Sequence, residues 1–225
     1  MNMLFKPALA AGIALAALAA PAAAQVNGIA TSNPALAIAQ AQARDAGYKQ
    51  IEQTFATQFQ QVQQLRAEQQ QLEASLDTNG DQNISEQEVQ ANPAVVQQIQ
   101  QKEQQLGQAT QPIALAQYYV IEQLLNDFPN ARQQVIEAKG IQVMLAPDAI
   151  QYGPQNMDVT QDIVAALNQR LPSVATAVPQ GWQPRQNTAQ VHQAVQQILV
   201  LAAAQAQARA QQGTAAPATQ QPVGR

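Results

Sequence analysis

Residues 51–106 read IEQTFATQFQQVQQLRAEQQQLEASLDTNGDQNISEQEVQANPAVVQQIQQKEQQL, and this stretch decides how the rest of the chain is interpreted. Gln, Ala and Glu dominate it, strand-forming residues are rare, and apolar residues recur at helical spacing. Turn-forming residues concentrate near its middle, in residues 77–88. The pattern predicts two helical arms of similar length within residues 44–128, joined by a loop at their far end.

Both arms carry a diluted heptad pattern, in which apolar residues lie seven apart and Gln, Glu or Thr takes some seam positions. The first arm supplies Phe55, Val62, Leu65, Leu72 and Leu76, and the second supplies Val96, Ile99, Leu106 and Ile113. Such a seam predicts long arms that pack weakly, and periodicity alone favours an ordinary helical hairpin. Because Pro lacks a backbone donor and clashes with the preceding turn, Gly107 and Pro112 predict a hinge, with Thr110 capping a new helix.

Residues 77–88 match the spacing of an EF-hand calcium loop, which takes oxygen ligands from positions 1, 3, 5, 7, 9 and 12. The corresponding residues are Asp77, Asn79, Asp81, Asn83, Ser85 and Glu88. Gln82 departs from the pattern, since Gly normally takes a positive φ at position 6, and a side chain there costs ~1–2 kcal/mol. Ser85 with Glu88 also forms the pattern of a capping box. Weak calcium binding and a plain helix start therefore both remain open.

The composition excludes several kinds of protein. The chain has no Cys and one His, so neither a Cys–His site nor a His cluster can form, and we expect His192 on the solvent face of a helix. No Gly-rich phosphate loop is present, and a net charge of −4 argues against nucleic acid as a partner. We expect no catalytic residues and no enzymatic activity.

The N-terminus has the pattern of a secretory signal peptide in residues 1–24. Lys6 precedes an apolar run, and residues 22–24 form an Ala-x-Ala cleavage pattern. The run is short for a membrane span, although an uncleaved anchor is the alternative. No later segment is long enough to span a membrane, so we expect an exported protein without an integral span.

Residues 25–43 and 129–185 are predicted to form a small body on which the arms are anchored. Asn33 and Pro34 have the pattern of a helix start, and a further helix is expected from Thr160 to about Arg170. Strands are predicted in residues 26–32, 141–146, 149–152 and 173–178. Residues 186–225 are predicted to contain an Ala- and Gln-rich helix followed by a disordered tail.

Two stretches of the predicted body resemble the Skp/OmpH family of periplasmic chaperones. VNGIATSNPALAIAQ, residues 26–40, resembles the opening strand and first turn of that family. GIQVMLAPDAIQYGPQNMDVTQDIVAALNQRL, residues 140–171, resembles its closing strand, turn, strand and helix. Asp158, Val159 and Thr160 match the opening of the last helix, whereas the arms match in architecture only.

The resemblance implies a mainly α protein with a small β body, in which a long antiparallel hairpin stands on a short-strand β-barrel completed by homotrimerisation. It implies a holdase in the periplasm of a Gram-negative bacterium, which keeps unfolded outer-membrane proteins from aggregating and needs no cofactor. The apolar arm residues that would contact clients are Phe55, Phe59, Val62, Leu65, Leu72, Val96, Ile99 and Leu106.

The arms depart from the family in their charge. Residues 45–125 carry ten acidic residues against three basic ones, whereas the family's best-known arms are basic. Electrostatic steering of acidic clients is therefore doubtful, and client binding would depend on apolar contacts. The acidic loop and the additional C-terminal helix favour an alternative function, a calcium-dependent structural or adaptor protein of the cell envelope on the same scaffold.

Overall fold

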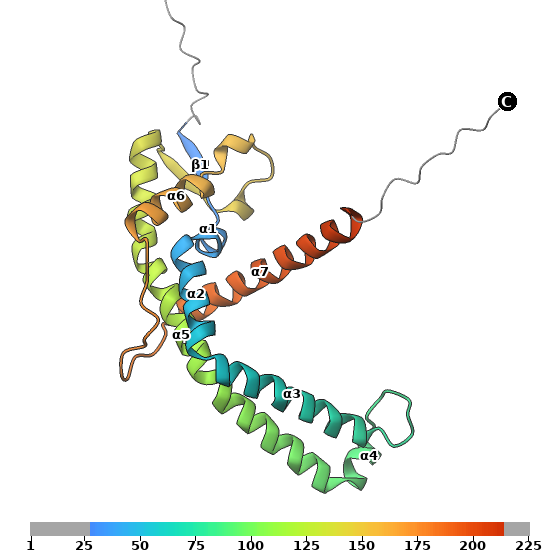
Figure 1. The fold of residues 1–225 in the computed structure, drawn as a ribbon. Coiled ribbons are helices and arrows are strands. Elements are labelled where there is room, and N and C mark those ends of the chain that lie inside the picture. The colour runs from blue at the N-terminus through green and yellow to red at the C-terminus, as the bar shows by residue number, and fades with distance from the viewer. Residues whose placement is uncertain (1–27, 214–225) are drawn as a thin grey trace, which may run out of the picture.

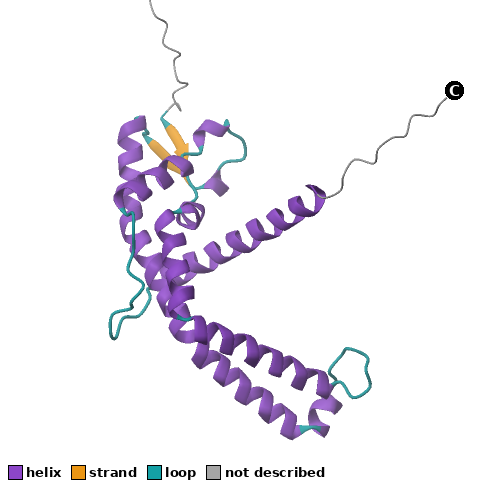
Figure 2. Ribbon diagram, in the orientation of Figure 1, coloured by secondary structure: helices purple, strands orange, loops and turns teal. Residues whose placement is uncertain are grey.

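The structure is a computed structural model that describes residues 28–213. A small body lies at one end, a helical hairpin extends from it, and a last helix projects from their junction (Figures 1 and 2). The predicted signal peptide and the end of the predicted tail lie outside the described residues. In chain order the elements are β1 (Ile29–Thr31), α1 (Pro34–Gln40), α2 (Gln42–Thr54), α3 (Ala56–Leu76), α4 (Glu86–Ala91), α5 (Pro93–Lys139), β2 (Val143–Leu145), the 3-10 turns η1 (Pro147–Ala149) and η2 (Gln155–Met157), α6 (Thr160–Arg170) and α7 (Gln186–Gly213).

A two-stranded parallel sheet holds the two ends of the body together. Ile29 lies opposite Val143, and Thr31 lies opposite Leu145. Parallel strands need a long crossover connection, and here the whole helical hairpin is that crossover. The strand predictions for residues 26–32 and 141–146 are confirmed in their described central residues.

The other two strand predictions are wrong. Residues 149–152 form no returning strand, because Pro147 opens a 3-10 turn that ends at Ala149 and the chain then bends. Residues 173–178 are not helical and pair with no strand in the described part of the chain.

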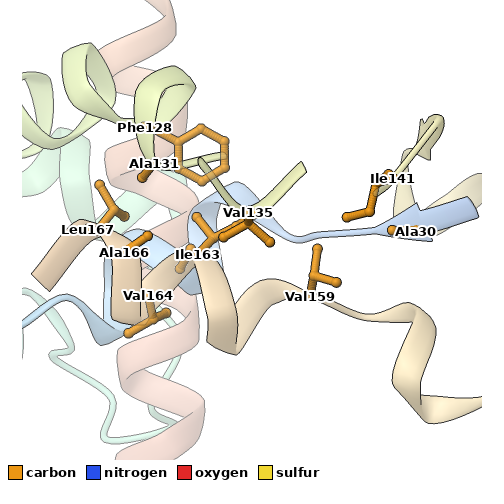
Figure 3. Packing of buried hydrophobic residues seen from close by; sticks show 11 residues of the cluster. Ala30, Phe128, Ala131, Val135, Ile141, Val159, Ile163, Val164, Ala166 and Leu167 are labelled. Atoms are coloured by element: carbon orange, nitrogen blue, oxygen red, sulfur yellow. The ribbon is translucent and has the colours of Figure 1, made fainter. Parts of the chain in front are cut away.

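The core of the body forms where the end of α5 packs against α6 and the sheet (Figure 3). α5 contributes Phe128, Ala131 and Val135, and α6 contributes its apolar face. Each large apolar side chain buried in this way adds about 1.5–3 kcal/mol to stability. The buried residues of this core are Ala30, Ala37, Phe128, Ala131, Val135, Ile141, Val159, Ile163, Val164, Ala166 and Leu167.

α5 is one continuous helix that links the arm to the body. It passes through Pro112 and Pro129 and ends at Gly140, whose φ of 63° gives the expected left-handed cap. The predicted helix restart at Pro112 is wrong, because the Thr110 hydroxyl donates to the Leu106 carbonyl oxygen at 2.7 Å, inside the same helix. The predicted arm boundary at residue 128 also falls inside α5. Both arms bend near the body (Figure 1). α5 remains continuous through its bend, as proline-containing helices can, whereas the first arm breaks at Phe55, between α2 and α3.

α7 packs its first half against α1 and α5 and then leaves the body (Figure 1). Val195 is completely buried, whereas Val200 and Leu201 are 66% and 62% exposed. The expectation of a solvent-facing His192 is wrong. Its ring packs edge-on against Tyr118, with centroids 4.5 Å apart, and burial lowers its pKa. No helix within residues 28–213 combines the length and apolar character needed to cross a membrane.

Candidate functional site

The hairpin formed by α3 and the first half of α5 buries its apolar residues in its own seam. Val62 and Leu65 are only 5% and 6% exposed, and they pack with Leu106 and Ala109 of the opposite arm. Because both arms use these side chains to hold each other, the heptad pattern describes the hairpin interface.

The other residues predicted to bind clients are partly buried. Phe55 and Phe59 pack at the arm root, against the cluster that α2 and α5 share. Leu72, Val96 and Ile99 are half-buried along the hairpin. None of the eight predicted residues is exposed, although Phe55 also lines an apolar pocket, and their role in client binding stays a prediction.

The tip of the hairpin carries the EF-hand-like loop, at the far end from the body (Figure 1). Asp77 organises it: its Oδ1 accepts the N–H of Gly80 at 2.8 Å, and its Oδ2 accepts the N–H of Gln82 at 2.8 Å. Gln82 has a φ of 64° and is the only non-glycine residue among those described with a positive φ. The backbone at position 6 thus has the left-handed conformation that an EF-hand loop requires, although the residue is not Gly.

Glu88 joins the two ends of this loop. Its Oε1 accepts hydrogen bonds from the Thr78 N–H at 2.8 Å and the Thr78 hydroxyl at 3.0 Å, and its Oε2 accepts from the Ser85 N–H at 2.9 Å. The Ser85 Oγ also accepts the Glu88 N–H, so the predicted capping box is present. Hydrogen bonds from the Ser85 backbone N–H and, as the next largest cause, from the Ser85 hydroxyl lower the pKa of Glu88 to about 2.

The three carboxylates of the predicted calcium site, Asp77, Asp81 and Glu88, are not gathered around one point. Within residues 28–213 no group of three or more His, Asp or Glu side chains is placed to hold a metal ion. Glu88 is engaged by Ser85 and Thr78, while Asp77 and Asp81 accept backbone N–H groups of the loop. Calcium binding by Asp77, Asn79, Asp81, Asn83, Ser85 and Glu88 therefore stays a prediction.

An apolar pocket of about 440 Å³ opens at the arm root, where α2 ends. Its walls come from three segments that are distant in sequence: the end of α2, the middle of α5 and residues 176–178. The lining residues are Gln50, Thr54, Phe55, Pro112, Leu115, Thr176, Ala177 and Val178, and none of them is charged. This pocket was not predicted from the sequence, although the strand-like pattern of residues 173–178 marks one of its walls.

Polar contacts fix the loop and helix that follow α6 onto α5. Glu122 is 9% exposed, accepts the Thr188 hydroxyl at 2.8 Å and pairs with the Arg185 Nε at 3.2 Å. Trp182 packs edge-on against Tyr119, with ring centroids 5.1 Å apart. These contacts hold residues 171–185 against the arm root and so keep one wall of the pocket in place.

A family model for OmpH-like outer membrane proteins matches residues 28–167. The match spans well over half of the chain, from β1 through both arms into α6. The chain belongs to the OmpH-like family. The family resemblance of residues 26–40 and 140–171 is thereby confirmed, and residues 171–185 and α7 of this OmpH-like chain lie beyond the matched range.

One solved structure similar to this OmpH-like chain is described as an outer membrane chaperone (OmpH-like) from Caulobacter crescentus CB15. The two share 20% sequence identity with a TM-score of 0.40, over 78% of this chain and 94% of the other. A comparison with curated protein sequences finds no match.

Proposed function

We propose that this OmpH-like protein is a periplasmic holdase chaperone that binds unfolded outer-membrane proteins and keeps them from aggregating, without ATP. The observation that carries the proposal is membership of the OmpH-like family over residues 28–167, together with a long hairpin on a small body. The signal-peptide pattern of residues 1–24 supports export to the compartment through which such clients pass.

The sheet supports an assembly of several chains as the working form. Two strands of three residues are too few to be stable alone, and Ile29, Val143 and Leu145 at the sheet are 41%, 47% and 37% exposed. Addition of the same strands from neighbouring chains would cover these side chains and close a barrel, which removes the open edges. We propose a homotrimer, as the family resemblance implies.

Light scattering coupled to size exclusion tests the assembly. The expected mass is three times that of one chain, and Val143→Lys should give single chains because a charge replaces an apolar strand residue. Gln151→Lys adds the same charge at an exposed position outside the strands and should leave the mass unchanged. A wild-type mass of one chain at micromolar concentration would refute the trimer.

Suppression of aggregation tests the chaperone function. A urea-denatured outer-membrane β-barrel protein is diluted into buffer with increasing amounts of this protein, and turbidity is followed. We expect turbidity to fall with the wild type, and less so with Leu72→Ala and Ile99→Ala, which remove half-buried arm residues. The matched controls Gln70→Ala and Gln100→Ala change exposed neighbours. Unchanged turbidity at a several-fold molar excess of wild type would refute the proposed function.

The conformation of the tip favours one second candidate, a calcium-dependent structural or adaptor protein of the envelope. Gln82 takes the left-handed conformation of position 6 in a calcium loop, at φ 64°, although it carries a side chain. A pull-down from envelope extract separates the two functions. A partner recovered with calcium but not with chelator, from a protein that leaves turbidity unchanged, would favour the adaptor.

A further inference from the structure

Residues 173–178 have the side-chain alternation of a β-strand, but no strand lies beside them in the part of the chain that the structure describes. Val174, Thr176 and Val178 are half-buried, whereas Ser173, Ala175 and Ala177 are exposed. Alternation with a period of two is the mark of an extended chain lying on a surface. This segment, which we call the root strand, lies against α5 at the junction of arm and body.

One edge of the root strand is already occupied. The side-chain amide of Gln123 pairs with Ala175, donating to its carbonyl oxygen at 2.8 Å and accepting its N–H at 2.9 Å. In an extended chain the backbone groups of successive residues point to opposite edges. The N–H and C=O of Thr176 therefore point away from Gln123, and no backbone hydrogen bond within residues 28–213 uses them.

The pocket continues the root strand on its inner face. Thr176, Ala177 and Val178 form one wall, and Phe55 and Leu115 form the others, around an open volume of about 440 Å³. The lining carries no charge, in contrast to the acidic arms. An occupant must therefore bring uncharged, apolar side chains on one face and backbone groups along one edge.

We propose that the root strand and its pocket form a docking site for one extended segment of an unfolded client, whose side chains alternate between apolar and polar. Strand addition supplies backbone hydrogen bonds, and pockets for alternate side chains supply selectivity. Transmembrane strands of outer-membrane barrels have this alternation. The inference rests on the proposed chaperone function and names the client feature that the arm root recognises.

A fluorescent peptide of about ten residues that alternates Thr with Val or Phe is the probe, and anisotropy measures its binding to the full-length protein. Thr54→Trp should weaken binding about tenfold or more, because an indole ring fills the apolar pocket and removes the buried area. The matched control is Gln53→Trp, which places the same ring on a neighbouring exposed position of α2 that does not line the pocket. Its affinity should equal that of the wild type.

A second pair of variants tests the backbone contact. Thr176→Pro removes the free N–H on the open edge, so the peptide should bind about fivefold more weakly, the value of one hydrogen bond. The control Gln180→Pro lies beyond the root strand, at a turn position that accepts Pro and does not line the pocket, and it should leave affinity unchanged. Far-UV circular dichroism before and after heating shows whether each variant is folded, and the Trp pair decides the question if a Pro variant is not.

The outcomes separate this inference from the proposed function. If the wild type suppresses aggregation but does not bind the peptide, or if Thr54→Trp binds it as well as Gln53→Trp, the docking site is refuted and the chaperone function stands. If the wild type does not suppress aggregation, the chaperone function fails, whatever the peptide does. Suppression together with selective loss in Thr54→Trp and Thr176→Pro supports both.

Discussion

Gly47 and Gly107 are both interior residues of helices, and Gly→Ala at these two positions should change stability in opposite directions. A Cβ at Gly47 would lie 3.1 Å from Val120 Cγ2 of α5 and 3.1 Å from Val174 Cγ2 of the root strand. A Cβ at Gly107 would have no neighbour within 4 Å. The comparison therefore measures how tightly α2, α5 and the root strand pack together.

The helix propensity term is the same at both positions and favours Ala by about 0.8–1 kcal/mol. Gly107→Ala should gain most of this value. At Gly47 the added methyl group also forces a fully buried Val120 to move, and overpacking of this kind costs typically about 1–3 kcal/mol. Gly47→Ala should therefore lose between about 0 and 2 kcal/mol, and the difference between the two variants should be about 1–3 kcal/mol.

Thermal unfolding followed by circular dichroism gives the difference, which corresponds to roughly 2–12 °C in Tm for a chain of this size. All variants must be compared at one protein concentration, because the proposed assembly would make Tm depend on concentration. Val174→Ala in the Gly47→Ala background should recover part of the loss, since it removes one of the two close contacts. Equal stabilisation by both Gly→Ala variants would refute the packing of α2 against α5 and the root strand.

Three further predictions follow from single groups. Burial lowers the pKa of His192 below its ordinary value of 6.5, so the unfolded chain binds a proton more readily than the folded chain does. Tm should therefore fall as the pH drops through 6.5, and His192→Gln should reduce that fall. Ser85→Ala removes the capping box and should cost about 1 kcal/mol locally, seen as faster hydrogen exchange around residues 77–88 with unchanged exchange in the body. Calcium at millimolar concentration should slow hydrogen exchange in the same residues, and Asp81→Asn should abolish that effect. If calorimetry detects no heat of calcium binding, the loop does not bind calcium and is only a turn.

Sequence reasoning located the arms because long helices depend on local patterns. Asn33 caps α1, Gly140 ends α5, and the heptad positions of the arms face each other, and all of these follow from neighbouring residues. The strands were harder to assign, since a three-residue strand depends on its partner. Residues 149–152 and 173–178 both have strand-like composition, and neither has a partner strand within residues 28–213. The helix restart predicted at Pro112 was wrong for a similar reason. Packing on α2 and α6 keeps α5 continuous through Pro112 and Pro129.

The candidate site was predictable only in part, and for a related reason. The loop from Asp77 to Glu88 is local, so its turn geometry and its capping box followed from the sequence. Periodicity predicted that Val62, Leu65 and Leu106 lie in the seam between the arms, but it does not say whether a client also contacts the apolar arm residues. The pocket at the arm root is lined by residues that are far apart in the chain, among them Phe55, Leu115 and Val178. No local pattern brings three such segments together.

Shortening both arms by one heptad separates the reach of the arms from binding at their root. The Glu68 carboxylate lies 2.5 Å from the Lys102 Nζ, which fixes the register of the two arms. Removing residues 66–72 together with 98–104 therefore deletes facing turns, keeps the seam in phase and shortens the hairpin by about 10 Å. The chain should stay helical and bind the alternating peptide with unchanged affinity, because the pocket at the arm root is intact. It should suppress aggregation less than the wild type if the arms enclose the client. Removing residues 66–72 alone leaves the facing turns of α5 unpaired and serves as the control for lost pairing. Loss of peptide binding in the double deletion would show that the client segment binds along the arms, and would refute binding at the root.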